Sequence, residues 1–408
     1  MVWMAGWRWA PLMLALTLAG CGSGGAGVSP ARGQEGRATG SPAPSPFTSA
    51  GPVATLAPAA SDELRVSKDG WKTDFAKHVI PLSEIASGGP GKDGIPALDK
   101  PKFVPLKEGD GFLKAKEQVV AFERSGEAKA YPIQILVWHE IVNDSRASDP
   151  VTITFCPLCN TAIVFDRRLG NQVLDFGTTG NLRNSDLVMY DRQTESWWQQ
   201  AEGLAIVGQL AGQNLTYLPA ELVSWEEFKK AFPEGTVLSR DTGFDRPYGR
   251  NPYQGYDAPD KTPFLFGGKP DNRLKPMERV LTLSVGGQDK AYPFSVLAQK
   301  GAINDQLGSL PLVVFFEKGA ASPLDAGQVG EGRDVGSAAA FDPRLDGQQL
   351  SFSAKDGHIV DEAGSSWDIF GGARSGRYAG RSLKPLVSGT YFWFAWAAFK
   401  PRTEIYPV

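Results

Sequence analysis

A long segment of this chain occurs twice, and this internal similarity limits the folds that the chain can adopt. Residues 118–155 align without a gap onto residues 279–316, and both contain Lys-Ala-Tyr-Pro, at 129–132 and at 290–293. The similarity resumes in the same order further along, where it pairs Phe165-Asp166 with Phe341-Asp342, Ser196-Trp197 with Ser366-Trp367, and Ala211-Gly212 with Ala379-Gly380. Chance does not produce so much order. The sequence therefore predicts two copies of one domain, each of about 130–140 residues.

Short strands dominate the pattern within each copy. The chain has 47 glycines and 30 prolines, which favour frequent turns over long helices. In the first copy, a short helix is predicted over 133–138, and a hairpin is predicted to pair 140–142 with 151–155. A capping box of Ser224 and Glu227 predicts a further helix. We therefore expect a strand-dominated α+β fold with two tandem copies of one β-rich domain.

The N-terminus resembles a bacterial lipoprotein signal. Arg8 precedes a short apolar run, and Leu18-Ala19-Gly20 leads directly to Cys21. We expect residues 1–21 to be a signal peptide with a lipidated Cys21. Acyl chains at this position would anchor the protein to a bacterial membrane, in an extracytoplasmic location at the cell surface or the periplasmic face.

Composition sets the other domain boundaries. Residues 22–63 are rich in Gly, Ala, Ser and Pro and are expected to form a disordered tether. The first repeat is expected over 64–240, an aromatic, Gly- and Pro-rich connecting loop over 241–275, and the second repeat over 276–408. The formal net charge of -3 gives no reason to expect nucleic acid as a partner.

A Cys-x-x-Cys motif follows a predicted strand in the first copy. Its cysteines are Cys156 and Cys159, and the only other cysteine is Cys21. In the predicted hairpin, His139 lies opposite Phe155 and therefore close to the first thiol. A protonated imidazole lowers the pKa of a neighbouring thiol and makes it a better nucleophile. The sequence thus predicts a catalytic set of Cys156, Cys159 and His139.

The second copy lacks this chemistry. At the aligned positions Lys300 replaces His139 and Glu317 replaces Cys156, and no cysteine follows. The scaffold therefore does not need these side chains for packing. Their presence in the first copy indicates a chemical role, and the second copy is expected to be a degenerate structural partner.

Three uses of the cysteine pair remain open. Thiol–disulfide redox chemistry would need no cofactor. Metal binding would use Cys156, Cys159 and His139 as soft ligands for zinc or copper. A purely structural disulfide is the third use, although a cross-link that closes so short a loop constrains the unfolded chain little.

A second polar segment goes with the cysteine-bearing copy. Arg183, Asn184 and Asp186 have no counterpart in the second copy, and Trp197 and Trp198 follow them. We predict that these five side chains bind substrate at the wall of a pocket. Without a role for the cysteines, they would indicate a cell-surface ligand-binding module instead.

Several blocks together resemble the bacterial and archaeal family catalogued as domain of unknown function 3179 (DUF3179). The blocks are Asp93-Gly94-Ile95-Pro96-Ala97, His139-Glu140-Ile141-Val142-Asn143-Asp144, Phe155-Cys156-Pro157-Leu158-Cys159, Leu182-Arg183-Asn184-Ser185-Asp186-Leu187 and Arg246-Pro247-Tyr248-Gly249-Arg250-Asn251-Pro252-Tyr253. The resemblance runs from about residue 70 to the C-terminus. It implies export but brings no substrate. Some members are described as selenoproteins, which favours redox catalysis at a cysteine position.

The leading hypothesis is a membrane-anchored, extracytoplasmic thiol oxidoreductase. Cys156 would attack, Cys159 would resolve the mixed disulfide, and His139 would act as the base or lower the thiol pKa. The expected partners are the membrane, through the lipidated N-terminus, and an unidentified thiol, disulfide or small-molecule substrate. The alternatives are a metal-binding or metal-delivery lipoprotein and a ligand-binding module.

Overall fold

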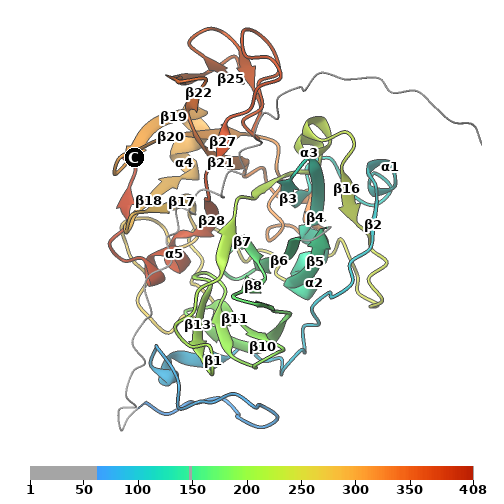
Figure 1. Ribbon diagram of the computed structural model, residues 1–408, viewed down its shortest axis with the longest axis vertical. Helices are drawn as coiled ribbons and strands as arrows, with labels where there is room; N and C mark the ends of the chain where they lie inside the picture. The colour runs from blue at the N-terminus through green and yellow to red at the C-terminus, as the bar shows by residue number, and fades with distance from the viewer. Residues whose placement is uncertain (1–61, 147–148, 408) are drawn as a thin grey trace, which may run out of the picture. The chain divides into compact units, whose positions relative to one another are not determined.

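The computed structural model describes residues 62–146 and 149–407. The predicted signal peptide, the predicted lipidation at Cys21 and nearly all of the predicted tether 22–63 lie outside these residues. Within them, short strands far outnumber helices (Figure 1). The strand-dominated α+β class is thus confirmed.

The first half of the described chain consists of short strands, most of them paired with the strand that precedes or follows them along the chain, and a few short helices. Its strands are β1 (Ile85–Ser87), β2 (Phe103–Pro105), β3 (Gln118–Arg124), β4 (Glu127–Pro132), β5 (Ile141–Arg146), β6 (Asp149–Cys156), β7 (Thr161–Asp166), β8 (Arg168–Leu169), β9 (Gln172–Val173), β10 (Phe176–Arg183), β11 (Asp186–Asp191), β12 (Trp197–Gln199), β13 (Leu204–Val207), β14 (Thr216–Leu218), β15 (Glu221–Ser224) and β16 (Thr236–Leu238). Its helices are η1 (Leu82–Glu84), α1 (Leu106–Gly109), α2 (Ile133–His139) and α3 (Trp225–Ala231).

Local sequence explains several of these elements. Ser125 and Gly126 have φ angles of 56° and 82°, the backbone of a two-residue turn that matches the twist of β3 and β4. Pro132 precedes α2 and has a φ of -64°, a value that the proline ring favours. The predicted capping box is confirmed, because Ser224 Oγ accepts from the amide of Glu227 and the Glu227 carboxylate accepts from the amide of Ser224.

Three sheets of four or five strands arise in the first half, in addition to the two-stranded sheet β8-β9. One has the order β15-β3-β4-β16-β2, the second β14-β7-β6-β5 and the third β1-β10-β11-β12-β13. β16 runs parallel to β4, whereas the neighbouring pairs in the second sheet are antiparallel. The second and third sheets carry the candidate site, since β6 ends with Cys156, the turn to β7 contains Cys159, and β11 begins with Asp186.

Much of this order of elements recurs in the second half, where the third sheet has only the strands β24-β25-β26. Its strands are β17 (Arg279–Val285), β18 (Gln288–Pro293), β19 (Ala302–Leu307), β20 (Leu310–Glu317), β21 (Ser337–Asp342), β22 (Arg344–Leu345), β23 (Gln348–Gln349), β24 (Phe352–Lys355), β25 (His358–Asp361), β26 (Ser366–Trp367), β27 (Lys384–Pro385), β28 (Gly389–Phe392) and β29 (Glu404–Ile405). Its helices are α4 (Phe294–Lys300), η2 (Val329–Glu331) and α5 (Trp393–Phe399). The sheet β28-β17-β18-β29 matches β15-β3-β4-β16, and β27-β21-β20-β19 matches β14-β7-β6-β5.

Two hydrophobic cores of the described residues contain residues of both halves. Trp225 and Phe228 of α3 belong to the same core as Phe315 and Phe341, which lie on β20 and β21. In return, β28 and α5 pack with the cysteine-bearing sheet, so that Trp393 shares a core with Cys156 and Cys159 and with the tryptophan Trp198. Each half thus covers a sheet of the other half, although each half also buries apolar side chains in cores of its own.

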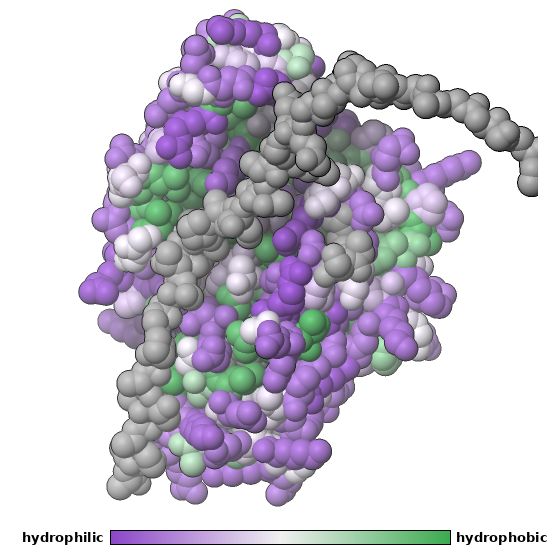
Figure 2. Space-filling view, in the orientation of Figure 1, coloured by the Kyte–Doolittle hydropathy of each residue, from purple (hydrophilic) through white to green (hydrophobic). Residues whose placement is uncertain are grey.

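No described helix is both long enough and apolar enough to cross a bilayer. The face drawn in Figure 2 is mostly hydrophilic, with apolar residues scattered across it in small groups.

Candidate functional site

The hairpin of β6 and β7 positions both cysteines. Cys156 is the last residue of β6 and pairs with Thr161, the first residue of β7, so the motif forms the connecting turn. The amide of Cys159 donates to the carbonyl of Cys156 at 3.3 Å, and the amide of Asn160 donates to that of Pro157 at 3.3 Å. Both thiols are free, and the two residues are only 2% and 0% exposed. The cysteines are therefore a buried dithiol.

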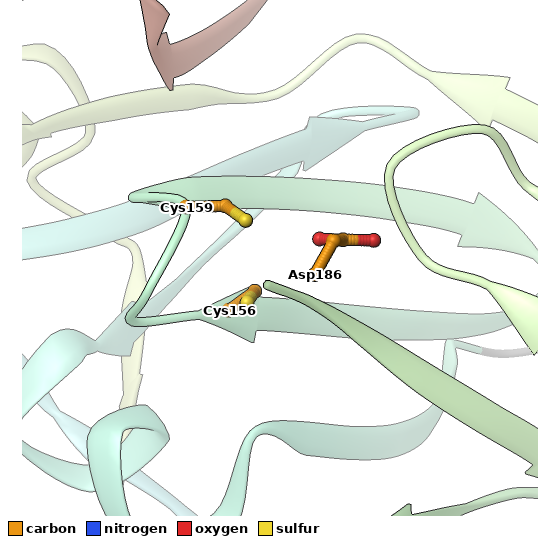
Figure 3. A group of neighbouring side chains, drawn as sticks. All are labelled: Cys156, Cys159 and Asp186. Atoms are coloured by element: carbon orange, nitrogen blue, oxygen red, sulfur yellow. The ribbon is translucent and has the colours of Figure 1, made fainter. Parts of the chain in front are cut away.

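A second turn brings Asp186 to the two thiols. β10 ends at Arg183 and β11 begins at Asp186, so Asn184 and Ser185 form a two-residue turn with φ angles of 53° and 65°. One ligand atom each of Cys156, Cys159 and Asp186 lies within 4.8 Å of the others. Figure 3 shows the carboxylate of Asp186 beside the two sulfurs. We call these three residues the dithiol–carboxylate cluster.

Hydrogen bonds hold the Asp186 carboxylate in place. Its Oδ2 atom accepts from Gln199 Nε2 at 2.6 Å and from the amide of Ala201 at 2.8 Å. Burial raises the pKa of Asp186 from its ordinary 3.8 to about 7, and hydrogen bonds from Ala201, Gln199 and the Cys159 thiol oppose this rise. A carboxyl group with a pKa near neutrality can both take up and release a proton at pH 7.

The thiols themselves differ from the prediction. Burial raises the pKa of Cys156, and the charges of Asp186 and Glu140 raise it further, while a hydrogen bond from Cys159 lowers it. Burial also raises the pKa of Cys159, by more. The sequence predicted a thiol activated by a protonated imidazole, but neighbouring carboxylates and an apolar environment favour the neutral thiol. Of the two, Cys156 ionises more easily.

His139 is not a member of the dithiol–carboxylate cluster. It is the last residue of α2, its Nδ1 lies 2.7 Å from the carbonyl oxygen of Pro96, and its Nε2 lies 2.6 Å from the hydroxyl of Tyr248. The predicted hairpin exists, but its register is shifted by one residue, since Ile141 pairs with Thr154 and the amide of Phe155 donates to the carbonyl of residue 140. The third member of the cluster is therefore Asp186, and not the predicted His139.

Glu140 is a site residue that the sequence reasoning missed. It caps the C-terminal end of α2 with a φ of 58°, a left-handed conformation that suits glycine, and the corresponding cap of α4 is Gly301 with a φ of 66°. Burial raises the pKa of Glu140 to about 8, and the charge of Asp186 contributes. An acidic side chain at the position that aligns with Gly301 of the second half was the signal that could have identified it.

Two of the predicted substrate-binding residues occupy the turn or its edge. Arg183 donates to Glu84 at 2.7 Å and to Gln199 Oε1 at 3.5 Å, so it supports the amide that holds Asp186. Asn184 adopts the left-handed conformation that the turn requires. These two residues therefore help to position Asp186, Arg183 through Gln199 and Asn184 through the turn.

The two tryptophans are core residues. Trp197 is fully buried and packs edge-on against Trp71 and Phe75. Trp198 is also fully buried, and its indole nitrogen donates to Asp191 at 2.9 Å. The sequence predicts that these two aromatic side chains bind substrate. In the structure both lie on β12 and are buried in the core.

Residues from the connecting loop and from the second half cover the dithiol. The hydroxyl of Tyr256 donates to the carbonyl of Leu158 at 3.1 Å, and Ser185 donates to the carbonyl of Phe264. The amide of Phe392, at the end of β28, donates to the carbonyl of Cys159 at 2.9 Å. Access of a substrate to the sulfurs therefore requires movement of this cover.

The cluster can support two kinds of chemistry. Two neighbouring thiols beside a group that exchanges protons at neutral pH can form and break a disulfide. Two sulfurs and one carboxylate oxygen are also a ligand set that suits zinc, while cuprous copper would use the two sulfurs. The predicted set of Cys156, Cys159 and His139 is less suited to a metal, because both imidazole nitrogens of His139 already have hydrogen-bond partners.

Comparison with known proteins identifies the family. A family model described as "Protein of unknown function (DUF3179)" matches residues 92–403. Searches among curated proteins and among solved structures gave no match. The match covers most of the chain, and the chain belongs to this family.

Proposed function

We propose that this protein is a thiol–disulfide redox protein in which Cys156 and Cys159 alternate between a dithiol and a disulfide. The observation that carries the proposal is the dithiol–carboxylate cluster, with its three ligand atoms within 4.8 Å of one another. Thiol–disulfide exchange needs two sulfurs in reach of each other and a group that moves protons at neutral pH. The pKa of Asp186, about 7, meets the second requirement.

The reaction follows from the order of the two thiols. Cys156 ionises more easily, so its thiolate attacks one sulfur of a substrate disulfide, forms a mixed disulfide and releases the first substrate thiolate, which takes up a proton. Asp186 accepts the proton of Cys159, whose thiol is hydrogen bonded to the carboxylate. The Cys159 thiolate then attacks Cys156 and releases the second substrate thiol. The protein loses two electrons and two protons, and the substrate disulfide gains them.

A redox titration tests this proposal. The full-length chain is equilibrated in buffers with different ratios of reduced to oxidised dithiothreitol, and its free thiols are then trapped with a maleimide that shifts the protein on a gel. We expect a reversible loss of two thiols together, which is absent from the double variant C156S/C159S. Glu317→Gln, at the position of Cys156 in the second half, serves as the control and should titrate like the unaltered protein. Thiols that react with the maleimide at every ratio of reduced to oxidised dithiothreitol would refute the proposal.

Metal binding is the second candidate, and the same geometry favours it. Cys156, Cys159 and Asp186 would hold a zinc ion with two thiolates and one carboxylate, and bound metal would draw the protons from both buried thiols. Elemental analysis of the purified chain separates the two candidates. Zinc or copper in a one-to-one ratio that withstands mild chelation and is lost in Asp186→Asn supports the metal candidate. Metal-free protein with a reversible disulfide contradicts it.

We also propose that the chain contains two copies of one domain. Supporting contacts recur in both halves: the hydroxyl of Tyr131 donates to Asp144 at 2.7 Å, and that of Tyr292 donates to Asp305 at 2.9 Å. The indole of Trp367 donates to Asp361 at 3.0 Å, as Trp198 does to Asp191. This contact supports pairing Trp367 with Trp198, one residue along from the Trp197 with which the sequence alignment pairs it. An experimental structure in which the matching sheets do not superpose would contradict this proposal.

The N-terminal sequence supports an anchored location for this chemistry. We propose that lipidated Cys21 holds the redox domain at the extracytoplasmic face of a bacterial membrane. Cell fractionation tests this, because Cys21→Ser should move the protein from the membrane fraction to the soluble or precursor fraction. Equal membrane retention of both forms would contradict lipidation at this residue.

A further inference from the structure

A cavity of about 340 Å³ lies on the surface near α2, apart from the buried dithiol. It is formed by residues 97–102, by the end of β16 and by the start of the connecting loop. The side chains that matter for the argument are Leu98, Lys100, Lys102, Leu238, Thr242 and Phe244. Its volume is within the range of small-molecule sites, and its walls combine apolar side chains with a few polar groups.

A hydrogen-bond chain connects this cavity to His139. The hydroxyl of Thr242 lies 2.5 Å from that of Tyr248, which lies 2.6 Å from Nε2 of His139. Nδ1 of the imidazole lies 2.7 Å from the carbonyl oxygen of Pro96, which can only accept, so Nδ1 carries a proton. Burial lowers the pKa of His139, which favours the neutral ring.

These constraints fix the direction of every hydrogen bond in the chain. In the neutral ring Nε2 accepts, so Tyr248 donates to His139 and Thr242 donates to Tyr248. The Thr242 oxygen also accepts from the amide of Phe244 at 3.3 Å. A hydroxyl oxygen has two lone pairs, so Thr242 retains one position that can accept from a ligand.

The charges around the cavity favour an anion. Lys102 is paired with Asp241 at 2.6 Å, and the carboxylate of Asp99 is engaged by Asn143 and Arg192. No ion pair is recorded for Lys100 among the described residues, and this lysine is exposed at the cavity. An ammonium group without a carboxylate partner is available for a ligand carboxylate.

An aromatic side chain completes the cavity. Phe244 is 42% exposed, which is unusual for its size, and its ring centroid lies 5.3 Å from that of His139. Leu98 and Leu238 provide apolar surface on the other walls. A flat, apolar ligand could pack against these groups while its polar ends reach Lys100 and Thr242.

We propose that this cavity is a binding site for a small hydroxylated aromatic carboxylate. The carboxylate pairs with Lys100, the ring packs on Phe244, and the hydroxyl donates to Thr242, from which the hydrogen-bond chain leads to His139. The dithiol takes no part in this recognition, so the inference is independent of the redox proposal. It gives His139 and the Arg246–Tyr253 segment a role that the dithiol–carboxylate cluster does not supply.

The experiment uses 4-hydroxybenzoate as the probe and NMR as the readout. The chain has 3 histidines, so the Cε1–H signal of His139 can be assigned with variants of the other two, His78 and His358. We expect a saturable shift of the His139 signal on titration. Benzoate, which lacks the hydroxyl, should bind about twofold to tenfold more weakly, the range for one hydrogen bond. A His139 signal that does not respond to 4-hydroxybenzoate would overturn the proposal.

Two variants test the assigned contacts. Lys100→Ala should weaken binding of 4-hydroxybenzoate by about twofold to fivefold, the range for an exposed ion pair, and unchanged affinity would overturn the assignment of an anionic ligand. Tyr248→Phe keeps the ring but breaks the chain, so the probe should still bind while the His139 shift decreases. An undiminished shift in that variant would refute the hydrogen-bond connection. The double variant C156S/C159S should bind the probe like the unaltered protein, and a loss of binding would contradict the separation of the two sites.

Discussion

Asp186→Asn separates the chemical role of the cluster from its effect on stability. Asparagine can still accept hydrogen bonds from Gln199 and Ala201, but it cannot carry a charge. Because burial raises the pKa of Asp186 from 3.8 to about 7, the folded protein binds this proton more tightly than the unfolded chain does. The proton on Asp186 therefore contributes stability that the unaltered protein loses as the pH rises through about 7, and the variant lacks this contribution.

The magnitude follows from the same pKa. One pKa unit corresponds to about 1.4 kcal/mol, so between pH 5 and pH 8 the Asp186 carboxylate should reduce the free energy of unfolding by about 2–3 kcal/mol. The unfolding free energy of Asp186→Asn minus that of the unaltered protein should therefore be larger at pH 8 than at pH 5 by about this amount. Loss of the proton acceptor should slow the resolving step by about a hundredfold or more.

Urea denaturation with EDTA present and the thiols reduced, at pH 5 and at pH 8, measures the stability effect. Release of thiol from a small disulfide substrate measures the rate. Glu317→Gln is the matched control, because burial also raises the pKa of Glu317 to about 7 and no thiol lies at its position. The control should show a stability change of the same sign and no change in rate. A difference in unfolding free energy that does not vary with pH would refute the role assigned to buried Asp186.

Three further predictions follow from the site. Glu140→Gly should raise the free energy of unfolding at pH 8 by about 1 kcal/mol or more, since it relieves a left-handed conformation and removes a buried acid. A lower free energy of unfolding in urea denaturation would contradict this. Cys159→Ser should accumulate a mixed disulfide between Cys156 and a disulfide substrate on a non-reducing gel, whereas Cys156→Ser should not, and the reverse pattern would exchange the two roles. Residues 64–240 alone should unfold at a lower temperature than the full chain, because two of the cores to which they contribute are completed by the second half; an equal unfolding temperature would contradict this.

Local features of the sequence predicted local structure well. The turn and strand signals around Val151–Phe155 identified the β5–β6 hairpin, and Ser224 with Glu227 identified the start of α3. These predictions succeeded because hairpins and helix caps depend on neighbouring residues. The exact register did not follow from the pattern, because the left-handed cap at Glu140 sets where β5 begins.

The composition of the cluster was harder to predict. His139 was placed beside the thiols by strand pairing, but it lies on α2, where the helix directs its side chain toward Pro96 and Tyr248. Asp186 joins the cluster through a contact between two sheets, and sequence spacing carries no information about such a contact. Trp197 and Trp198 were misassigned for a related reason, since an aromatic pair looks the same in a sequence whether it faces a ligand or a core.

The packing of β28 and α5 on the cysteine-bearing sheet has a consequence for how the two halves can change over evolution. The wall beside Cys159 includes Phe392, which lies in the half that has no thiols. A substitution there alters the surroundings of the sulfurs without touching the motif, so mutational effects in the two halves should be epistatic. Random mutagenesis of β28, scored by thiol reactivity, should yield variants whose defects are compensated by second changes in β6 or β7. The shape of the half without thiols is thus constrained by the sulfurs of the other half.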